Sequence, residues 1–413
     1  QSRVIIVVGI EEGCFLKVRL YGHLCAAFGL AGGAKATARA LRAAGCSVLP
    51  IDLVLPTHAA LANSSELTSK SSLSDLAAVD AAEGVAEVGG AGVADSAMVH
   101  VDLVHTNPNV LASSPELLAN HQLTAPVRIG YWAWELEEFP RGWERFFADY
   151  QEIWCPSSFT AQALAQRAPV PVVAVPHLPD WPRLERLNAE RFSQPAQESS
   201  ERPFTFFTLF DYWSTVERKN PLGVIEAFET AFPRDDPAGP AVRLTIKTSS
   251  SEQFLDKAAA LRRRTAHDPR MQWLDALLPQ DQLDALYLKA DALVSLHRAE
   301  GFGLTLAEAM GMGIPVIATG YSGCMDFMPP GSGCLIPWSM QPIPRTFGDY
   351  VAGAYWAEPS IKDAAAAMRQ LACDPAWSRQ LGQQGRSVVS ERLSQQRVTA
   401  VVRQRLGHFL LPA

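Results

Sequence analysis

Short apolar segments alternate with longer amphipathic segments along most of this 413-residue chain. The short segments have the length of strands, and the longer ones carry the apolar spacing of helices. Such an alternation predicts an α/β fold with parallel sheets. The segments expected to form or end strands are 16–24, 47–53, 98–104, 127–131, 153–155, 170–175, 204–210, 242–247, 292–296 and 314–318.

Helices are expected at 34–44, from about 159, at 222–231, 254–264 and 281–289, and in a long tail at 377–411. The first helix follows a glycine-rich turn, Gly29 to Gly33, and Gly45 is a suitable C-terminal stop because glycine readily adopts the left-handed conformation. Ser157 or Ser158 is expected to cap the second helix. Residues 57–97, which are rich in Ala, Ser and Gly, are expected to be weakly ordered helix and loop.

The α/β pattern stops once and then restarts. The interruption is a polar stretch from about Leu187 to Pro203, which has the composition of a linker. A chain of this length is also too long for one hydrophobic core. We therefore expect two domains, 1–190 and 200–385, with a ligand-binding cleft where the carboxyl ends of their sheets meet.

Composition excludes several classes of protein. The chain is 48% hydrophobic and 19% charged, and its net charge of -7 argues against a nucleic-acid binder. Its seven cysteines are scattered without a Cys-x-x-Cys pair, unlike a disulfide framework or a zinc site. No stretch approaches the roughly 20 apolar residues of a membrane span, and the run Val4–Ile10 is short for a secretory signal. A cytoplasmic protein is expected, and a peripheral membrane contact through a local basic patch stays open.

The segment most informative about chemistry runs from Arg298 to Asp326. Gly301 and Gly303 allow a backbone to approach a ligand closely, and a helix is expected to open near Thr305. Free amides at such a helix start favour an anion such as a phosphate. Glu300 and Glu308 flank this point, where sugar and ribose hydroxyls would be suitable partners for carboxylates.

A structural interpretation of the same residues is equally compatible with the sequence. Thr305 and Glu308 have the spacing of a capping box, in which the glutamate satisfies backbone donors at the helix start. Glu300 could then be a solvated loop residue. The residues alone leave both interpretations open.

Glu300 and Glu308 form an E-x7-E pattern, and the surrounding EGFGLTLAEAMG resembles glycosyltransferase family 4, whose members are retaining enzymes of the GT-B type. Further segments resemble one bacterial surface-polysaccharide branch of that family in the same order: GYWAWELEEFP (130–140), EIWCPSSF (152–159), RKNP (218–221), SGCMDFM (322–328) and WAEP (356–359). The resemblance covers most of residues 16–390. It implies a GT-B architecture, in which two doubly wound Rossmann-like domains face each other across a cleft and the C-terminal helix, 386–413, crosses back to the first domain.

The resemblance also implies roles for individual residues. Glu300 would contact the transferred sugar, and Glu308 would hold the ribose. Lys219, with Arg218 beside it, would hold the diphosphate. The sugar and diphosphate would also bind backbone amides at Phe302, Gly303, Leu304 and Thr305.

The sequence departs from the family pattern at one cationic position, because Phe210-Asp211 stands where a Gly-Arg pair is usual. Lys247 is the candidate substitute for the missing arginine. Among residues of the first domain, Gly29 matches the loop that approaches the diphosphate.

Residues that end strands of the first domain are further candidates for the cleft. Asn107 is one, and Glu135 is a candidate acid or polar anchor. Trp132 could stack on a sugar ring or equally belong to the core. His105 and His177 are weaker candidates, since a lone histidine is more often structural.

The implied reaction is a retaining transfer of a sugar from a UDP- or GDP-sugar to a glycan or lipid-linked glycan acceptor, in bacterial polysaccharide or lipopolysaccharide biosynthesis. The catalytic residues would be Glu300, Glu135 and Lys219, without a cofactor or a catalytic metal. A glycosidase is disfavoured, because its two carboxylates must flank the scissile bond. The alternatives are a nucleotide-sugar epimerase on the same fold and a non-catalytic nucleotide-sugar-binding scaffold.

Overall fold

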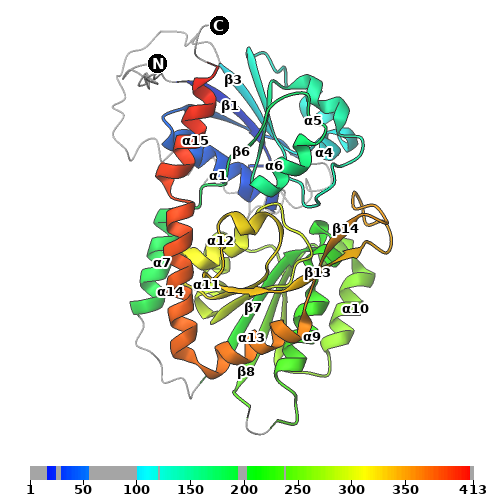
Figure 1. Ribbon diagram of the computed structural model, residues 1–413, viewed down its shortest axis with the longest axis vertical. Coiled ribbons are helices and arrows are strands. Elements are labelled where there is room, and N and C mark those ends of the chain that lie inside the picture. Colours follow the sequence, from blue (N-terminus) through cyan, green and yellow to red (C-terminus); the bar gives the residue numbers. More distant parts are fainter. Residues whose placement is uncertain are drawn as a thin grey trace, which may run out of the picture.

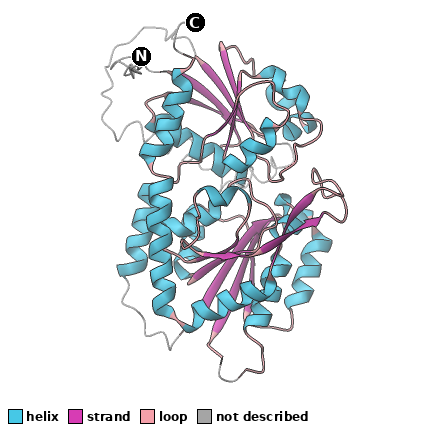
Figure 2. Ribbon diagram, viewed as in Figure 1, coloured by secondary structure: helices cyan, strands magenta, loops and turns pink. Residues whose placement is uncertain are grey.

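The computed structural model describes residues 16–24, 29–54, 100–119, 121–193, 202–236 and 239–409. Two α/β halves are stacked along its long axis, each with a twisted central sheet covered by helices (Figures 1 and 2). The predicted α/β class with two Rossmann-like halves is therefore confirmed. The segment 57–97 and the centre of the predicted linker lie outside the described residues.

The first sheet has the strand order β2-β1-β3-β4-β5-β6, and its neighbouring strands are all parallel. Its strands are β1 (Lys17–Gly22), β2 (Ser47–Asp52), β3 (Val101–His105), β4 (Val127–Tyr131), β5 (Glu152–Cys155) and β6 (Val172–Ala174). The helices of this half are α1 (Gly29–Ala43), α4 (Pro108–Ser113), α5 (Glu116–Ala119), the 3-10 helix η1 (Glu144–Asp149) and α6 (Ser158–Ala165). Adjacent strand residues point to opposite faces, so Leu20 packs in the core on the α1 side, whereas Tyr21 packs in an aromatic core on the other side.

The second sheet is also parallel, with the order β12-β11-β10-β7-β8-β9. Its strands are β7 (Phe204–Asp211), β8 (Val242–Ser249), β9 (Met271–Asp275), β10 (Ala292–Ser295), β11 (Val316–Thr319) and β12 (Cys334–Ile336). The helices of this half are η2 (Tyr212–Ser214), α8 (Val216–Lys219), α9 (Pro221–Ala231), η3 (Ser251–Gln253), α10 (Leu255–Thr265), α11 (Gln280–Lys289), α12 (Leu304–Gly311), η4 (Ser322–Asp326) and α13 (Ile361–Cys373). A separate antiparallel pair, β13 (Trp338–Pro342) and β14 (Tyr355–Pro359), extends from its side (Figure 1).

Three helices run along one side of the molecule and connect the halves: α7 (Trp181–Ser193), α14 (Pro375–Arg392) and α15 (Gln395–Gly407). Figure 1 shows α7 beside α14, with α15 continuing upward to α1. Arg403 of α15 donates to the carbonyl of Ala44 at 3.1 Å, and Arg405 donates to Glu152 at 3.0 Å. The last helix thus packs on the first half of the chain.

Many predicted elements agree with the structure within a few residues, and Ser157 caps α6 by accepting from the amide of Thr160. Gly45 has a φ of 92°, which matches its predicted role as a helix stop. The prediction of a single helix in the tail is wrong, because helix α14 ends at Arg392 and Ser394 caps a second helix, α15.

Two further predictions are corrected. The glycine-rich turn, Gly29 to Gly33, is the first part of α1 rather than a turn before it. A side chain at position 33 would be crowded, since a Cβ there would lie 3.0 Å from the ring of His105 and 3.0 Å from that of His177. The linker does not begin at Leu187, because α7 continues to Ser193 and Leu187 is buried among residues of the second half.

The carboxyl ends of the two sheets face each other, and the loops that follow the strands are in contact. Ser157 donates to the carbonyl of Gly301 at 2.6 Å, and the amide of Ser158 donates to Asp326 at 2.6 Å. In the described part of the chain, no helix is both long and apolar enough to cross a bilayer.

Candidate active site between the two halves

The loop between β10 and α12 presents Glu300 at the junction of the halves. Gly303 has a φ of 93° and precedes the first residue of α12, a conformation that glycine adopts without a steric penalty. The amide of Glu300 donates to the hydroxyl of Ser322 at 2.8 Å. A Cβ on Gly323 would lie 2.1 Å from the carbonyl oxygen of Gly301. The segment 322–326 therefore supports the Glu300 loop through direct backbone contact.

Glu300 is buried and paired with two cations. Its carboxylate accepts a hydrogen bond from Lys219, and its other oxygen lies 3.5 Å from Arg218. Burial by itself would raise the pKa of Glu300, but the charges of Lys219 and Arg218 outweigh it and lower the pKa to about 2. Glu300 is therefore a carboxylate at neutral pH, and the interpretation as a solvated loop residue does not apply.

Arg218 is the central cation of the group. Its guanidinium donates to the carbonyl of Ala299 at 2.8 Å and lies 3.9 Å from the carboxylate of Glu135. The Tyr350 ring lies 5.9 Å from it, and the Tyr350 hydroxyl donates to Glu135 at 2.9 Å. Burial would lower the pKa of Arg218, but Tyr350, Glu135 and Glu300 raise it, so the side chain stays charged. Within the described part of the chain, its Nε has no hydrogen-bond partner.

Glu308 does not cap the helix. Because α12 begins at Leu304 with Gly303 as its N-cap, Thr305 is already inside the helix and the capping-box interpretation is wrong. The Glu308 carboxylate instead accepts from Arg183 of α7 at 2.6 Å. Its second oxygen is 3.5 Å from the hydroxyl of Tyr287. One oxygen of Glu308 is thus tightly held and the other only weakly.

The structure brings together Glu300, Lys219, Arg218 and Glu135, and places the start of α12 beside them. Phe302 is buried against His177, with ring centroids 4.9 Å apart. Leu304 and Thr305 are half-buried in the first turn of α12. Such a group of cations and outward-pointing helix amides can bind an anion, and the carboxylates can accept hydrogen bonds from hydroxyl groups.

Other predicted site residues lie elsewhere or have another role. The charges nearest Lys247 are those of Asp211 and Asp275, while burial lowers its pKa. Asn107 exchanges two hydrogen bonds with the backbone of Ala133, at 2.9 and 2.8 Å, so its amide supports the chain after β4. Gly29 begins α1.

Trp132 belongs to the aromatic core. Its side chain is completely buried, and it packs against Trp143, Phe147 and Tyr150. The core alternative therefore applies to Trp132, and the sugar-stacking alternative is wrong, since a buried ring offers no free face.

His105 and His177 form a buried stack with Tyr131. The rings of His105 and Tyr131 are 4.1 Å apart, and those of Tyr131 and His177 are 5.3 Å apart. Burial lowers the pKa of both histidines, that of His177 to about 3, so both are neutral at physiological pH. The stack supports the start of α1 through Gly33.

Sequence reasoning missed Tyr350 and Arg183. Tyr350 lies between β13 and β14, outside the motifs, and Arg183 precedes a stretch that reads as a linker. Neither residue carries a local signal of its contacts, since each depends on a segment more than 100 residues away.

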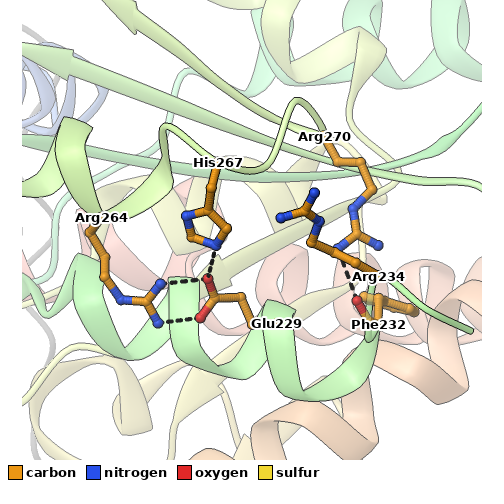
Figure 3. Close-up of a pocket in the computed structure, with 6 residues that line it drawn as sticks. All are labelled: Glu229, Phe232, Arg234, Arg264, His267 and Arg270. Carbon is orange, nitrogen blue, oxygen red and sulfur yellow. Dashed lines mark hydrogen bonds and ion pairs between the residues drawn. The ribbon is translucent and has the colours of Figure 1, made fainter.

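A separate basic pocket lies near the amino ends of β8 and β9, whereas the Glu300 site lies at the carboxyl ends of the strands. It has a volume of about 310 Å³ and is lined by Glu229, Phe232, Arg234, Arg264, His267 and Arg270. Figure 3 shows Arg264 and His267 converging on Glu229, and Arg270 donating to the carbonyl of Phe232. Most of these charges are already paired, which indicates a structural cluster.

Among the described residues, no group of three or more His, Cys, Asp or Glu side chains could hold a metal ion.

Comparisons with known proteins identify the architecture. HepE of Anabaena, solved with UDP and glucose, is 14% identical; the match covers 95% of this chain and 100% of HepE, with a TM-score of 0.59. Sucrose-phosphate synthase of Thermosynechococcus elongatus is also 14% identical, with 95% and 99% covered and a TM-score of 0.61. The fold is GT-B.

The family model "Glycosyl transferases group 1" matches residues 212–388, which lie in the second half of the fold and include Glu300, Lys219 and Arg218. TarM of S. aureus, solved with UDP and alpha-GlcNAc-glycerol, is 15% identical with a TM-score of 0.51. That match covers 75% of this chain and 55% of TarM, so the chain spans about half of TarM's length. A search of curated protein sequences gives no match.

Proposed function

We propose that the protein is a retaining glycosyltransferase that moves a sugar from a UDP- or GDP-sugar to a glycan or lipid-linked glycan acceptor. The observation that carries this proposal is the buried group of Glu300, Lys219 and Arg218 beside the first turn of α12, inside the segment that matches the glycosyl transferase model. The UDP in the structures of HepE and TarM supports a nucleotide-linked donor.

The chemistry follows from the charges at this site. When the bond between the anomeric carbon and the diphosphate breaks, negative charge develops on the leaving group. Lys219 and Arg218 would stabilise that charge together with the amides at the start of α12, which are already oriented. Glu300 would bind hydroxyls of the transferred sugar, and we propose that no catalytic metal takes part.

Glu135 connects the reaction to the first half of the chain. Its carboxylate lies 3.9 Å from Arg218 and accepts from Tyr350. We assign Glu135 to the acceptor side of the site. The acceptor would belong to bacterial polysaccharide or lipopolysaccharide assembly at the inner face of the cytoplasmic membrane, as the family resemblance implies.

The test is a thermal-shift screen of UDP-, GDP-, dTDP- and ADP-sugars, followed by turnover with and without acceptor. A donor at about a hundredfold excess over its Kd should stabilise the protein by roughly 2.7 kcal/mol. The variants Lys219→Ala and Glu308→Ala should lose the shift, while Lys257→Ala, on the outer helix α10, should keep it. Absence of a shift with every nucleotide sugar would contradict the proposal.

Turnover separates the alternatives. A glycosyltransferase releases nucleoside diphosphate in proportion to glycosylated acceptor. A nucleotide-sugar epimerase would convert the donor without an acceptor, and a scaffold would bind the donor without converting it.

A further inference from the structure

Arg183 connects Glu308 with a second carboxylate, Asp284. Its Nη1 lies 2.6 Å from Glu308, while its Nε and Nη2 lie 3.0 and 2.5 Å from the same Asp284 oxygen. The Arg183 side chain is only 12% exposed. This use of the guanidinium requires its planar, forked set of donors, which a lysine does not have.

Arg183 belongs to helix α7, which makes hydrogen bonds to the second half along its length. In α7, Trp181 donates to the carbonyl of Leu393 at 2.9 Å, Asn188 to that of Met312 at 3.0 Å, and Arg191 to that of Ala290 at 2.6 Å. The same helix leads directly from the first half of the chain into the second. A side chain on α7 therefore holds Glu308 from the segment where the halves join.

The contact leaves Glu308 partly free to bind a ligand. Arg183 uses Oε1, whereas among the described residues Oε2 has only the 3.5 Å contact with Tyr287. Arg39 of α1 also interacts electrostatically with Glu308, but its guanidinium donates to the carbonyl of Leu178 at 3.0 Å. A carboxylate held by one oxygen is fixed in orientation, and its other oxygen can accept from the hydroxyls of a ribose.

We propose that Arg183 is a positioning residue for the donor nucleotide, which holds Glu308 in the orientation that accepts the ribose hydroxyls. The inference rests on the proposed function, and it includes the ribose contact that the family resemblance implies for Glu308. It adds that recognition of the ribose depends on a contact made from helix α7.

The test compares ribonucleotide and deoxyribonucleotide binding by calorimetry. UDP and 2′-deoxy-UDP, and separately GDP and 2′-deoxy-GDP, are titrated into wild type, Arg183→Met and Arg186→Met. Wild type should bind the ribonucleotide about tenfold more tightly, the effect of one hydrogen bond to a charged group. Arg183→Met should bind the ribonucleotide about tenfold more weakly and discriminate little between the two forms.

Arg186→Met is the matched control. Arg186 lies on the same helix and is 3.6 Å from Asp284, but its side chain is 62% exposed and its other ion pair is with Glu190. This variant should keep both the affinity and the discrimination of wild type. If Arg183→Met does not fold, Arg183→Lys serves instead, and its discrimination should fall between wild type and none.

The outcomes separate the two proposals. If wild type binds neither nucleoside diphosphate, the proposed function and this inference both fail. If wild type binds a ribonucleotide but does not discriminate, or if Arg183→Met discriminates as strongly as wild type, only the inference is overturned. A loss of folded structure alone would weaken both forms equally, so the ratio of the two Kd values reports the positioning role.

Discussion

The hydroxyl of Tyr350 donates a hydrogen bond to the carboxylate of Glu135, 215 residues earlier in the chain, at 2.9 Å. Tyr350 belongs to the segment between β13 and β14, and Glu135 to the loop after β4. The rings of Tyr350 and Trp134 also stack, with centroids 5.6 Å apart. This contact joins the two halves beside the buried Arg218 and holds Glu135 close to it.

Tyr350→Phe removes this hydrogen bond while leaving the ring in place. Because the acceptor is a charged, largely buried group, the expected loss is about 1.5–3 kcal/mol of unfolding free energy. Urea unfolding measures it. Tyr355→Phe is the control, since Tyr355 is 49% exposed and should unfold like wild type. Equal stability of the two variants would show that the contact with Glu135 contributes nothing.

The ion pairs of Glu300 predict how stability depends on pH. The pKa of this carboxyl is lowered from 4.5 to about 2 in the folded protein, so its contribution is complete above pH 4.5 and is lost as the pH falls toward 2. That contribution is on the order of 3 kcal/mol. The unfolding free energies of wild type and Glu300→Gln should therefore differ by a constant amount at pH 5–7 and converge below pH 4.5. A difference that grows with acid would give the opposite sign and rule out the ion pair as its source.

Gly323→Ala should disturb the loop that carries Glu300. The added Cβ would lie 2.1 Å from the carbonyl oxygen of Gly301, so the backbone must shift at a cost of about 1–3 kcal/mol. A lower melting temperature and weaker binding of the donor are expected together. Gly320→Ala is the control, because Gly320 lies in the same segment after β11 as Gly323, and its Cβ would meet no atom closer than 3.5 Å. If Gly323→Ala binds donor as wild type does, the loop does not depend on this close approach.

Trp132→Phe tests whether the indole belongs to the core. A smaller ring leaves a cavity among Trp143, Phe147 and Tyr150, so the unfolding free energy should fall by about 1–3 kcal/mol. The KM values for donor and acceptor should stay unchanged, because the ring is completely buried in the core. A raised KM with unchanged stability would instead favour contact with a sugar.

The α/β class and many strands and helices could be predicted from the sequence, because burial of each strand and amphipathicity of each helix are recorded in local spacing. The predicted strand 127–131 agrees residue for residue with β4. The sequence predicted that Ser157 or Ser158 caps α6, and Ser157 is the cap. Predictions failed where packing overrides local pattern. The glycines at 29–33 look like a turn but begin a helix whose small residues allow contact with buried rings.

The chemical groups of the site follow from the amino-acid sequence alone. Two glutamates, Glu300 and Glu308, have seven residues between them, which include a glycine pair and a helix start, and a basic pair, Arg218 and Lys219, lies more than 80 residues earlier. The partners of these groups depend on the tertiary structure. Glu300 is paired with Lys219, Glu308 with Arg183, and Glu135 with Tyr350, each across a long separation in sequence. Local spacing specifies secondary structure, whereas ion pairs and hydrogen bonds between largely buried side chains form only where the folded sheets bring distant loops together.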